Sequence, residues 1–421
     1  MQAVVLAAGA ASRFWPLGER RHKSCVALMG KPIVAWTLES LQSAGIREAI
    51  VVQRPERDVS TALEHHSFDM EIQMVEQPEP RGMGHALLTA REQLHEPFLL
   101  VHAHQIDADR WISSMRHRQQ ASGASVVLAG RPTDDPSRYG MLTFEGDRVT
   151  GIVEKPDPSE APSNVRALGI YWLPPEFLAE LAETAEGEYA FEDALDRFVK
   201  GHEARVVTES SPSPSLKYPW DLFDLNRRLV DRHLHAHQAA SAWVSPLAHL
   251  EGDVFVGEHA KVFEYAVVKG PCYIGDDCVV GTHSLVREYT DVEPGTTIGA
   301  HAEVARCLFQ AGASTHSGYF GDSILDRGAR AGAGTVTANV TVHRGEIRST
   351  VKGERVRTGR RSLGAVVGED TQLGINVSTM PGVLIGSHAF VAPAAAVDDN
   401  VPSDTRLDLQ QQTTRKTRRR R

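Results

Sequence analysis

Two hydrophobic patterns divide this chain of 421 residues. Over residues 1 to about 230, runs of consecutive apolar residues such as AVVLAA (3–8) and EAIVVQ (48–53) alternate with helix-patterned segments such as PIVAWTLESLQSAG (32–45). Runs that are apolar at nearly every position are typical of strands buried on both faces, and helices between them predict a mostly parallel sheet covered on both sides. We therefore expect an α/β domain over residues 1–228.

From residue 250 the hydrophobic period is six. Aliphatic residues follow at strict six-residue intervals, and they are Leu250, Val256, Val262, Val268, Ile274, Val280, Val286, Val292, Ile298 and Val304. The spacing resumes at Val367 and includes one polar residue, Thr379. A six-residue repeat predicts a parallel β-helix. The pattern resembles left-handed β-helices, in which three hexads make one triangular coil, so every third residue of the series would stack in one inward column.

The remaining boundaries follow from these two patterns. We expect a linker helix over 229–243, a β-helix over 244–403 and a disordered basic tail over 404–421. Residues 305–366 break the six-residue phase and hold GYFGDSILDRGARAGAGTVTANV, so they are expected to carry loops and a functional site.

Composition and charge narrow the functional classes. No apolar stretch approaches the roughly 20 residues that a bilayer span requires, and MQAVVLAAGAASRF lacks the basic region of a signal peptide, so we expect a cytoplasmic protein without a membrane partner. The net charge is -9, although RKTRRRR (415–421) contributes six positive charges. The folded body is therefore acidic, which argues against nucleic-acid binding by that body.

The segment LAAGAASRFWPLGERRHKSCVALMGKP (6–32) contains the first candidate site. A glycine turn after a strand lets backbone N–H groups approach phosphates, and Arg13 and Lys23 would supply fixed positive charge. The segment matches neither GxGxxG nor GxxxxGK[ST], which counts against dinucleotide and P-loop sites. Spacing alone leaves open an ordinary strand–helix turn with a surface arginine and lysine.

This segment resembles the signature of sugar-1-phosphate nucleotidylyltransferases, which runs LAAGxGTR, then PL, PK and GKP. The matching residues are Gly9, Arg13, Pro16, Leu17, Lys23, Gly30, Lys31 and Pro32. Further matches follow in the family's order, and they are EQPEPRGMGHA (76–86), YG (139–140), VEKP (153–156), GIY (169–171) and YPWDLFDLN (218–226). The resemblance implies a Rossmann-like nucleotidyltransferase domain that joins a nucleoside triphosphate to a sugar-1-phosphate and releases pyrophosphate.

The resemblance also assigns roles. The residues that would bind the nucleotide are Leu6, Ala8, Gly9, Gln77 and Gly82. Those that would neutralise developing charge, together with Mg²⁺, are Arg13 and Lys23. The residues that would hold the sugar phosphate are Gly140, Glu154 and Lys155. Without the surrounding motif, an exposed ion pair is the favoured interpretation of Glu154 and Lys155.

Several positions depart from the family pattern. Ala11 stands where the family has a second loop glycine, and Met83 stands where it has threonine. The two metal-binding aspartate positions align with His104 and Ser215, and imidazole suits Mg²⁺ poorly. A softer metal held by His102, His104 and His85 is one alternative, and Asp107 as a substitute carboxylate is another.

The second half also resembles a known family. HSGYFGDSILDRGARAGAGTVTAN (316–339) and SLGAVVGEDTQLGINVSTMPGVLIG (362–386) are similar to the acetyltransferase half of bifunctional sugar-1-phosphate nucleotidylyltransferase/glucosamine-1-phosphate acetyltransferases, the archaeal type most closely. The resemblance implies His316 as general base, with Tyr319 three residues on, Asn339 as an amino-sugar contact and acetyl-CoA as co-substrate. Arg330 replaces an asparagine, and could itself bind phosphate. Ala305 stands near an expected phosphate-binding lysine, with Arg306 beside it.

Two hypotheses follow for the whole chain. The first is a bifunctional enzyme that uses UTP or dTTP, N-acetylglucosamine-1-phosphate or a hexose-1-phosphate, and acetyl-CoA. The second is a catalytically impaired relative that binds sugar nucleotides or acts as a scaffold, with one half active at most. Left-handed β-helix acyltransferases are typically trimers, so the resemblance also implies a homotrimer held by residues 244–400.

Overall fold

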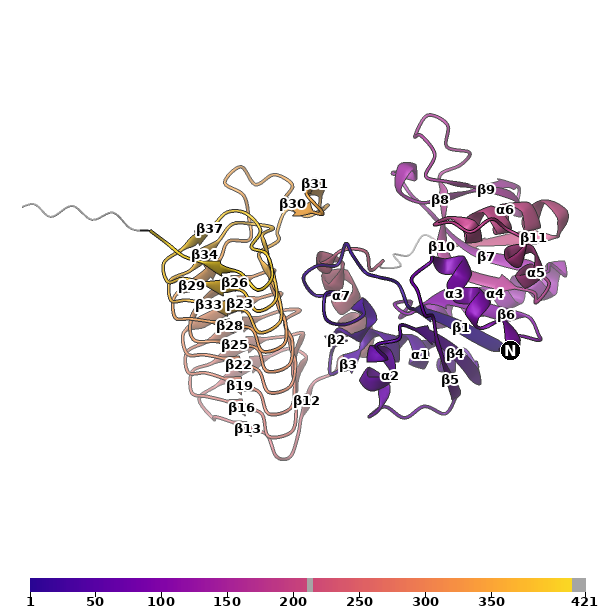
Figure 1. Ribbon diagram of the computed structural model, residues 1–421. Coiled ribbons are helices and arrows are strands. Elements are labelled where there is room, and N and C mark those ends of the chain that lie inside the picture. Colours follow the sequence, from indigo (N-terminus) through magenta and orange to yellow (C-terminus); the bar gives the residue numbers. More distant parts are fainter. Residues whose placement is uncertain (210–214, 411–421) are drawn as a thin grey trace, which may run out of the picture. The chain divides into compact units, whose positions relative to one another are not determined.

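The computed structural model describes residues 1–209 and 215–410 (Figure 1). Contacts within the chain divide it into two compact units. The first unit comprises Met1–Ser12, Arg20–Ala27 and Lys31–Leu216, and the second comprises Arg13–Glu19, Leu28–Gly30 and the chain from Lys217 onward. In the described ranges no helix has the length and apolar character needed to cross a bilayer.

The first unit is built on a nine-stranded sheet with the order β5-β4-β1-β6-β10-β7-β11-β9-β8. Its strands are β1 (Gln2–Ala7), β4 (Glu48–Gln53), β5 (Glu71–Glu76), β6 (Phe98–His102), β7 (Val126–Pro132), β8 (Gly140–Glu145), β9 (Arg148–Glu154), β10 (Val165–Leu173) and β11 (Ala204–Thr208). The expected parallel arrangement holds for β5, β4, β1 and β6, whereas β10 runs antiparallel to both β6 and β7. The sheet is therefore mixed, because the β8–β9 hairpin and β10 add antiparallel pairs.

Helices cover both faces of this sheet, as the sequence predicts. They are α1 (Ile33–Ser43), α2 (Asp58–Leu63), α3 (Met83–Thr89), α4 (Ala108–Ser122), α5 (Phe177–Ala182) and α6 (Ala190–Gly201), with 3₁₀ turns η1 (Lys23–Cys25), η2 (Arg91–Gln93) and η3 (Pro136–Arg138). Successive side chains of a strand point to opposite faces. In β1, Val4 and Leu6 accordingly join the core beneath α3, α5 and α6, while Ala3 and Val5 join the core beneath α1 and α4.

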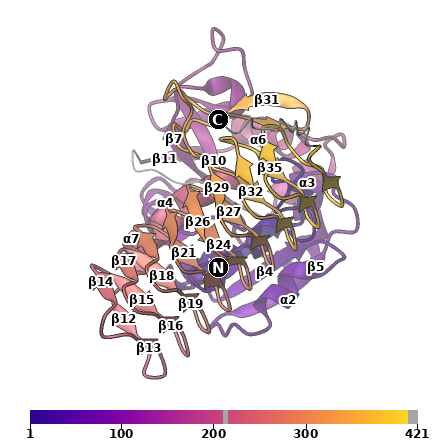
Figure 2. The same cartoon turned by 90° about the vertical axis from the view of Figure 1, so that its left-hand side faces the viewer.

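The second unit contains the predicted left-handed β-helix, whose strands form three parallel sheets (Figure 2). The β12 sheet consists of β12 (His237–Gln238), β15 (Val254–Val256), β18 (Cys272–Ile274), β21 (Asp291–Val292), β24 (Leu308–Phe309), β27 (Ile324–Leu325), β32 (Val366–Val367) and β35 (Leu384–Ile385). The β13 sheet consists of β13 (Trp243–Val244), β16 (Lys261–Val262), β19 (Val279–Val280), β22 (Thr297–Ile298), β25 (Ser314–Thr315), β28 (Arg330–Ala331), β33 (Gln372–Leu373), β36 (Phe390–Val391) and β38 (Arg406–Leu407). The β14 sheet consists of β14 (His249–Glu251), β17 (Val267–Lys269), β20 (Leu285–Arg287), β23 (Ala302–Ala305), β26 (Gly318–Gly321), β29 (Thr335–Thr337), β34 (Ser378–Thr379) and β37 (Ala396–Val397).

Strand register confirms the inward column that the six-residue period predicts. Leu250 pairs with Val268, Val268 with Val286 and Val286 with Val304. The last three of these side chains are fully buried. One stacked aliphatic core per chain therefore holds the coils together through apolar burial.

The break of phase after Val304 has a simple structural form. Val304 and Phe309, Thr315 and Phe320, and Phe320 and Leu325 are each five residues apart, yet all of them keep inward, buried positions in register with neighbouring coils. Three corners of the helix are thus shortened by one residue. Between β29 and β32 the chain then inserts a loop with the hairpin β30 (Arg348–Val351) and β31 (Glu354–Arg357).

Two boundaries differ from those expected. The 3₁₀ turn η4 (Pro219–Asp221) leads into helix α7 (Leu222–His233), and residues 237–244 of the expected linker helix already form strands of the β-helix. The turn η4 has a capping box, in which the Asp221 carboxylate accepts the backbone N–H groups of Lys217 and Tyr218 at 2.7 and 2.8 Å. Strand β38 lies inside the expected tail and pairs with β36. The RKTRRRR run lies outside the described residues.

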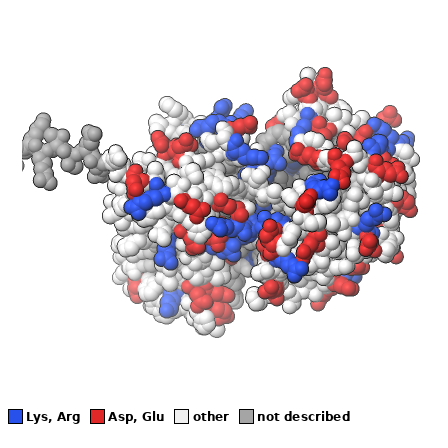
Figure 3. All heavy atoms as spheres, viewed as in Figure 1, with Lys and Arg blue, Asp and Glu red and all other residues white. Residues whose placement is uncertain are grey.

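Charged side chains are interspersed on the surface drawn in Figure 3, where small groups of Lys and Arg alternate with groups of Asp and Glu. On this face the pattern is that of a solvated protein surface, since a surface that follows a nucleic-acid backbone gathers its cations in a patch or stripe.

Candidate active sites

The loop after β1 contains the first predicted nucleotide-binding residues. Leu6 and Ala8 are buried, whereas Gly9 is exposed and a Cβ atom on it would meet nothing within 4 Å. Ala11 adopts a φ of 50°. This left-handed region favours glycine, so an alanine there costs about 1 kcal/mol. The loop therefore retains the glycine-type backbone despite the substitution. Arg13 is exposed and groups with the second unit.

Lys23 is the first residue of the 3₁₀ turn η1, and three histidine rings lie in its neighbourhood. Its Nζ donates to the carbonyl oxygen of Leu216 at 2.6 Å. The Lys23 charge lowers the pKa of His22, His102 and His104, which places these three rings in its electrostatic neighbourhood. The rings of His102 and His104 stack, with centroids 5.4 Å apart and planes at 16°.

All three histidines are held neutral. Burial, followed by the Lys23 charge, lowers the pKa of His22 to about 3 and that of His102 to about 4, and the same two causes lower the pKa of His104 well below its usual range. His22 Nδ1 accepts the backbone N–H of Ser24 at 3.3 Å, which caps η1 and needs an unprotonated nitrogen. Among Lys23 and these three histidines, the Lys23 ammonium therefore carries the charge.

The residues at the two family metal positions do not fit Mg²⁺. His104 offers an imidazole and Ser215 a hydroxyl, whereas Mg²⁺ prefers carboxylate oxygens. Asp107, the alternative carboxylate, is 1% exposed, and its Oδ2 lies 4.0 Å from Arg110 Nη1. Across the described residues no set of three or more His, Cys, Asp and Glu side chains could hold a metal ion, which also removes support for a softer metal at His102, His104 and His85.

The predicted base-reading residues lie together. Gln77 is buried, and its Nε2 lies 3.3 Å from the Gly82 carbonyl oxygen and 2.9 Å from His85 Nδ1. Gly82 is the N-cap of α3 with a φ of 93°, a conformation that L side chains rarely adopt. These contacts fix the turn that presents the start of α3, where Met83 stands.

The predicted sugar-phosphate residues converge at the end of β9. Gly140 pairs with Glu154, and a Cβ atom on Gly140 would lie 2.8 Å from Glu154 Oε2. Lys155 Nζ lies 3.7 Å from Glu154 Oε1 and 2.6 Å from Tyr189 Oη, above the Tyr189 ring. The hydrogen bond with Tyr189 is the main cause that raises the pKa of Lys155. Gly140 is thus required for the Glu154 carboxylate to lie where it does.

Glu192, which the sequence analysis did not single out, belongs to the same neighbourhood. Burial, with a smaller contribution from the nearby Glu154 carboxylate, raises its pKa to about 7. Its Oε2 is buried without a hydrogen-bond partner. Glu192 lies in the first turn of α6, where an acidic residue ordinarily only complements the helix dipole, so its position in the sequence carried no signal.

In the β-helix, His316 lies at one of the shortened corners, between β25 and β26. Its side chain is exposed, and its backbone N–H donates to the Ala331 carbonyl oxygen at 2.9 Å. A Cβ atom on Gly299, in the preceding coil, would collide with the His316 carbonyl oxygen. The corner is therefore fixed through the backbone, which leaves the imidazole free of a packing role.

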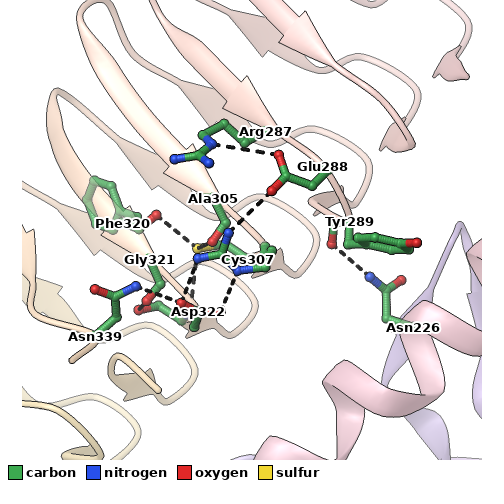
Figure 4. Close-up of polar contacts among 12 residues, drawn as sticks. Asn226, Arg287, Glu288, Tyr289, Ala305, Cys307, Phe320, Gly321, Asp322 and Asn339 are labelled. Atoms are coloured by element: carbon green, nitrogen blue, oxygen red, sulfur yellow. Dashed lines mark hydrogen bonds and ion pairs between the residues drawn. The ribbon is translucent and has the colours of Figure 1, made fainter. Parts of the chain in front are cut away.

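Tyr319 and Asn339 meet over Gly321. A Cβ atom on Gly321 would lie 2.5 Å from Asn339 Nδ2 and 2.6 Å from Tyr319 Oη. Asn339 Nδ2 donates to Asp322 Oδ2 at 2.6 Å (Figure 4). Asp322 also accepts two hydrogen bonds from Arg306, at 2.7 and 3.0 Å. The carboxylate therefore orients both the asparagine and the arginine.

The structure separates the remaining predicted residues. Ala305 is fully buried in β23 and offers no polar group, whereas Arg306 is engaged by Asp322 and lies 3.4 Å from Glu288. Arg330 projects from β28 of the β13 sheet, and Asn339 follows β29 of the β14 sheet. Within one chain these two predicted phosphate and sugar contacts thus belong to different sheets.

Asp322 was missed at the sequence level, although its signal was present. The five-residue intervals on either side of Phe320 mark two shortened corners, and Asp322 occupies one of them with a φ of 45°. Counting the residues between successive inward positions, instead of only noting where the six-residue period stops, would have identified the shortened corners that hold Arg306 and Asp322.

Replacing Gly321 with alanine is expected to lower acetyl transfer by at least about tenfold, because the new Cβ would displace Tyr319 and Asn339. Steady-state thiol release from acetyl-CoA measures the effect. Gly345→Ala is the matched control, since a Cβ there meets nothing within 4 Å. Equal rates for the two variants would contradict a role for this cluster.

Comparison with known proteins identifies the family. Residues 2–213 match the family of nucleotidyl transferases. Over 415 residues the chain is 30% identical to the bifunctional sugar-1-phosphate nucleotidylyltransferase/acetyltransferase of Sulfurisphaera tokodaii, with 95% of this chain and 98% of that protein covered. The chain belongs to this bifunctional family. The family that the motifs predicted, and its order of halves, are thereby confirmed.

Two further relatives agree with this assignment. The bifunctional protein GlmU of Methanocaldococcus jannaschii is 26% identical over 410 residues, which cover 96% of this chain and 97% of that protein. The UTP–glucose-1-phosphate uridylyltransferase AglF of Haloferax volcanii is 29% identical over 245 residues, which cover 56% of this chain and 99% of that protein. The chain is therefore a transferase-family protein with a nucleotidyl transferase domain and a β-helix.

Proposed function

We propose that the first unit transfers a nucleotidyl group from UTP or dTTP to N-acetylglucosamine-1-phosphate or a hexose-1-phosphate. A phosphate oxygen of the sugar attacks the α-phosphorus in line, and the bond to pyrophosphate breaks as the new P–O bond forms. The observation that carries the proposal is the arrangement at the end of β9, where Glu154 and the Lys155 ammonium lie 3.7 Å apart beside Tyr189.

Each residue of this unit has a defined part in the proposed reaction. Glu154 would accept a hydrogen bond from a sugar hydroxyl, and Lys155 would hold the sugar phosphate. Lys23 would neutralise charge that develops on the departing pyrophosphate. Gln77 and the Gly82 turn would face the pyrimidine.

We propose that the β-helix transfers an acetyl group from acetyl-CoA to the amino group of glucosamine-1-phosphate. The amine attacks the thioester carbonyl, the C–N bond forms and the C–S bond breaks. His316 takes the proton that the amine loses and returns it to the thiolate of CoA. Tyr319 and Asn339 would contact the amino sugar over Gly321.

A hollow on the outer face of the β13 sheet supports acetyl-CoA as the donor. It measures about 420 Å³ and is bordered by Arg330, Phe390 and Arg406. The Arg406 guanidinium lies 4.5 Å above the centre of the Phe390 ring. Arg330 pairs in register with Ser314, two residues before His316. Guanidinium groups and an aromatic face suit the phosphates and adenine of a nucleotide.

Two assays on the full chain test both activities. Pyrophosphate release is followed with UTP or dTTP and each sugar-1-phosphate, and thiol release with acetyl-CoA and glucosamine-1-phosphate. Turnover in each assay is the expected result. Nucleotide binding without pyrophosphate release under any condition would favour the second candidate, a sugar-nucleotide-binding relative, which the His104 and Ser215 substitutions specifically support.

We also expect a homotrimer. Val336 pairs with Tyr319 on the β14 sheet and is 38% exposed, and Met380, which follows β34, is 40% exposed. Apolar side chains exposed beside a catalytic residue favour burial by a second copy. Sedimentation equilibrium should give three times the 46.0 kDa chain mass. A monomer at micromolar concentration would contradict this expectation, and the Val336→Asp variant should dissociate the trimer if this face is the interface.

A further inference from the structure

The side chains near Lys23 include imidazole rings at positions where a Mg²⁺ site would need carboxylates. His104 and Ser215 occupy the two metal positions, and His102 fills the adjoining space at the end of β6. Gly169 makes room for it, because a Cβ atom on Gly169 would lie 2.5 Å from His102 Cδ2 and 2.8 Å from His102 Nε2. The stacked ring pair is thus accommodated by the backbone of β10 and is part of the fold.

Two carboxylates in the segments that flank this cluster already face arginines. Asp58 accepts the backbone N–H of His22 and lies 2.6 Å from Arg54 Nη2. Asp107 is buried at the start of α4 beside Arg110. Each of these carboxylates is thus already paired with an arginine.

Charge then decides what this centre can bind. A divalent cation beside Lys23 would meet a positive charge and imidazole rings, with no carboxylate at positions 104 and 215 to offset its loss of hydration. A phosphate oxygen would instead meet the ammonium directly, as an anion does in metal-free phosphate sites. The residues present therefore favour an anion and disfavour a metal.

We infer that the first unit binds its nucleotide in the metal-free form, with the phosphates held by Lys23 and with no divalent cation held by the protein. This inference rests on the proposed nucleotide function of the unit. It also assigns His104 and Ser215 as the two positions that changed the metal requirement. Restoring aspartate at both should restore the requirement, since each carboxylate would pair with the Lys23 charge and supply hard oxygen ligands.

The experiment measures nucleotide affinity and metal binding separately on the full chain. UTP and UDP-N-acetylglucosamine are titrated calorimetrically in EDTA and in excess Mg²⁺. For the native chain we expect excess Mg²⁺ to weaken the binding of UTP, because Mg²⁺ complexes the free nucleotide that this site takes. For His104→Asp/Ser215→Asp we expect Mg²⁺ to tighten binding by more than about tenfold. The matched control is His104→Asn/Ser215→Asn, which has the same shape without the charge.

A second readout does not depend on the variants. Mn²⁺, which takes the same hard oxygen ligands, is titrated in the presence of UDP-N-acetylglucosamine and followed by electron paramagnetic resonance. The native chain should leave the Mn²⁺ signal equal to that of a solution of nucleotide alone. The double aspartate variant, if folded, should bind one additional Mn²⁺.

The outcomes separate this inference from the proposed function. Nucleotide binding that requires Mg²⁺, or a protein-bound Mn²⁺ in the native chain, would overturn the inference and leave nucleotidyl transfer standing. A folded double aspartate variant that shows no gain over the asparagine control would also overturn it. Failure of the native chain to bind nucleotide in either condition would overturn both.

Discussion

Alanine at position 316 is expected to lower the rate of acetyl transfer to glucosamine-1-phosphate by about 10²–10⁴, because the amine would lose its general base. The imidazole is exposed and the corner is held by backbone contacts to Ala331 and Gly299. The melting temperature of the β-helix should therefore change little. Thiol release from acetyl-CoA measures the rate, and calorimetry measures the stability.

His301 provides the matched control for this variant. It is an exposed histidine at a corner of the preceding coil, and its ring stacks on that of His283 with centroids 5.2 Å apart. His301→Ala should keep full acetyltransferase activity. If His316→Ala also keeps it, the assignment of the general base is wrong. Loss of activity together with unfolding would instead show that the corner needs the side chain.

The β-helix was the part of the fold that the sequence determined most closely. A period of six fixes both which residues point inward and which residues stack, so the column from Val268 to Val304 could be written before any coordinates were known. The shortened corners were not predicted. A corner that is one residue shorter keeps its inward residue buried but shifts the phase of the repeat, so a strict six-residue count does not select Phe309 and Phe320.

In the α/β domain, motif spacing selected candidate site residues but not their protonation. Glu154 and Lys155 were selected from four letters, VEKP, and their charged groups lie 3.7 Å apart. The neutral state of His22 and His102 depends on packing from distant segments and on the charge of Lys23, which no local pattern encodes. The buried Oε2 of Glu192 was missed for the same reason.

The boundary between the two domains was predicted less well than the interior of either domain. The expected linker helix over 229–243 rested on polar, helix-compatible composition. The structure ends α7 at His233, and His237 already pairs with Phe255 and stacks on its ring at 4.9 Å. Two-residue strands carry too few positions for a periodic signal, so the first coil could not be separated from the helix before it.

Acidification is expected to destabilise the first unit between about pH 6.5 and pH 4, with a loss on the order of 3 kcal/mol from His22 alone. Its pKa falls from 6.5 to about 3 on folding, because burial and the charges of Lys23 and Arg54 outweigh the attraction of Asp58. The unfolded chain therefore binds more protons in this window. Stability is fully present above pH 6.5 and is lost as pH falls through the window.

Neighbouring groups set the size of this effect. His102 and His104 act in the same direction, with the pKa of His102 lowered to about 4 by burial and by Lys23. Glu192 acts in the opposite direction, since its pKa is raised to about 7 and its protonation favours the fold as pH decreases. The three histidines together outweigh this one carboxyl, so the net change remains a loss of stability.

Hydrogen exchange on peptides from residues 31–209 of the full chain reports the first unit alone. Protection should fall steeply below pH 6 after correction for the intrinsic exchange rate. The variant His102→Asn/His104→Asn should move that fall to lower pH, because asparagine cannot titrate. His117→Asn, at an exposed position of α4, is the matched control and should leave the profile unchanged. A profile that is flat from pH 7 to pH 4 would show that these histidines are solvated and charged, and would remove the basis for an imidazole-lined centre around Lys23.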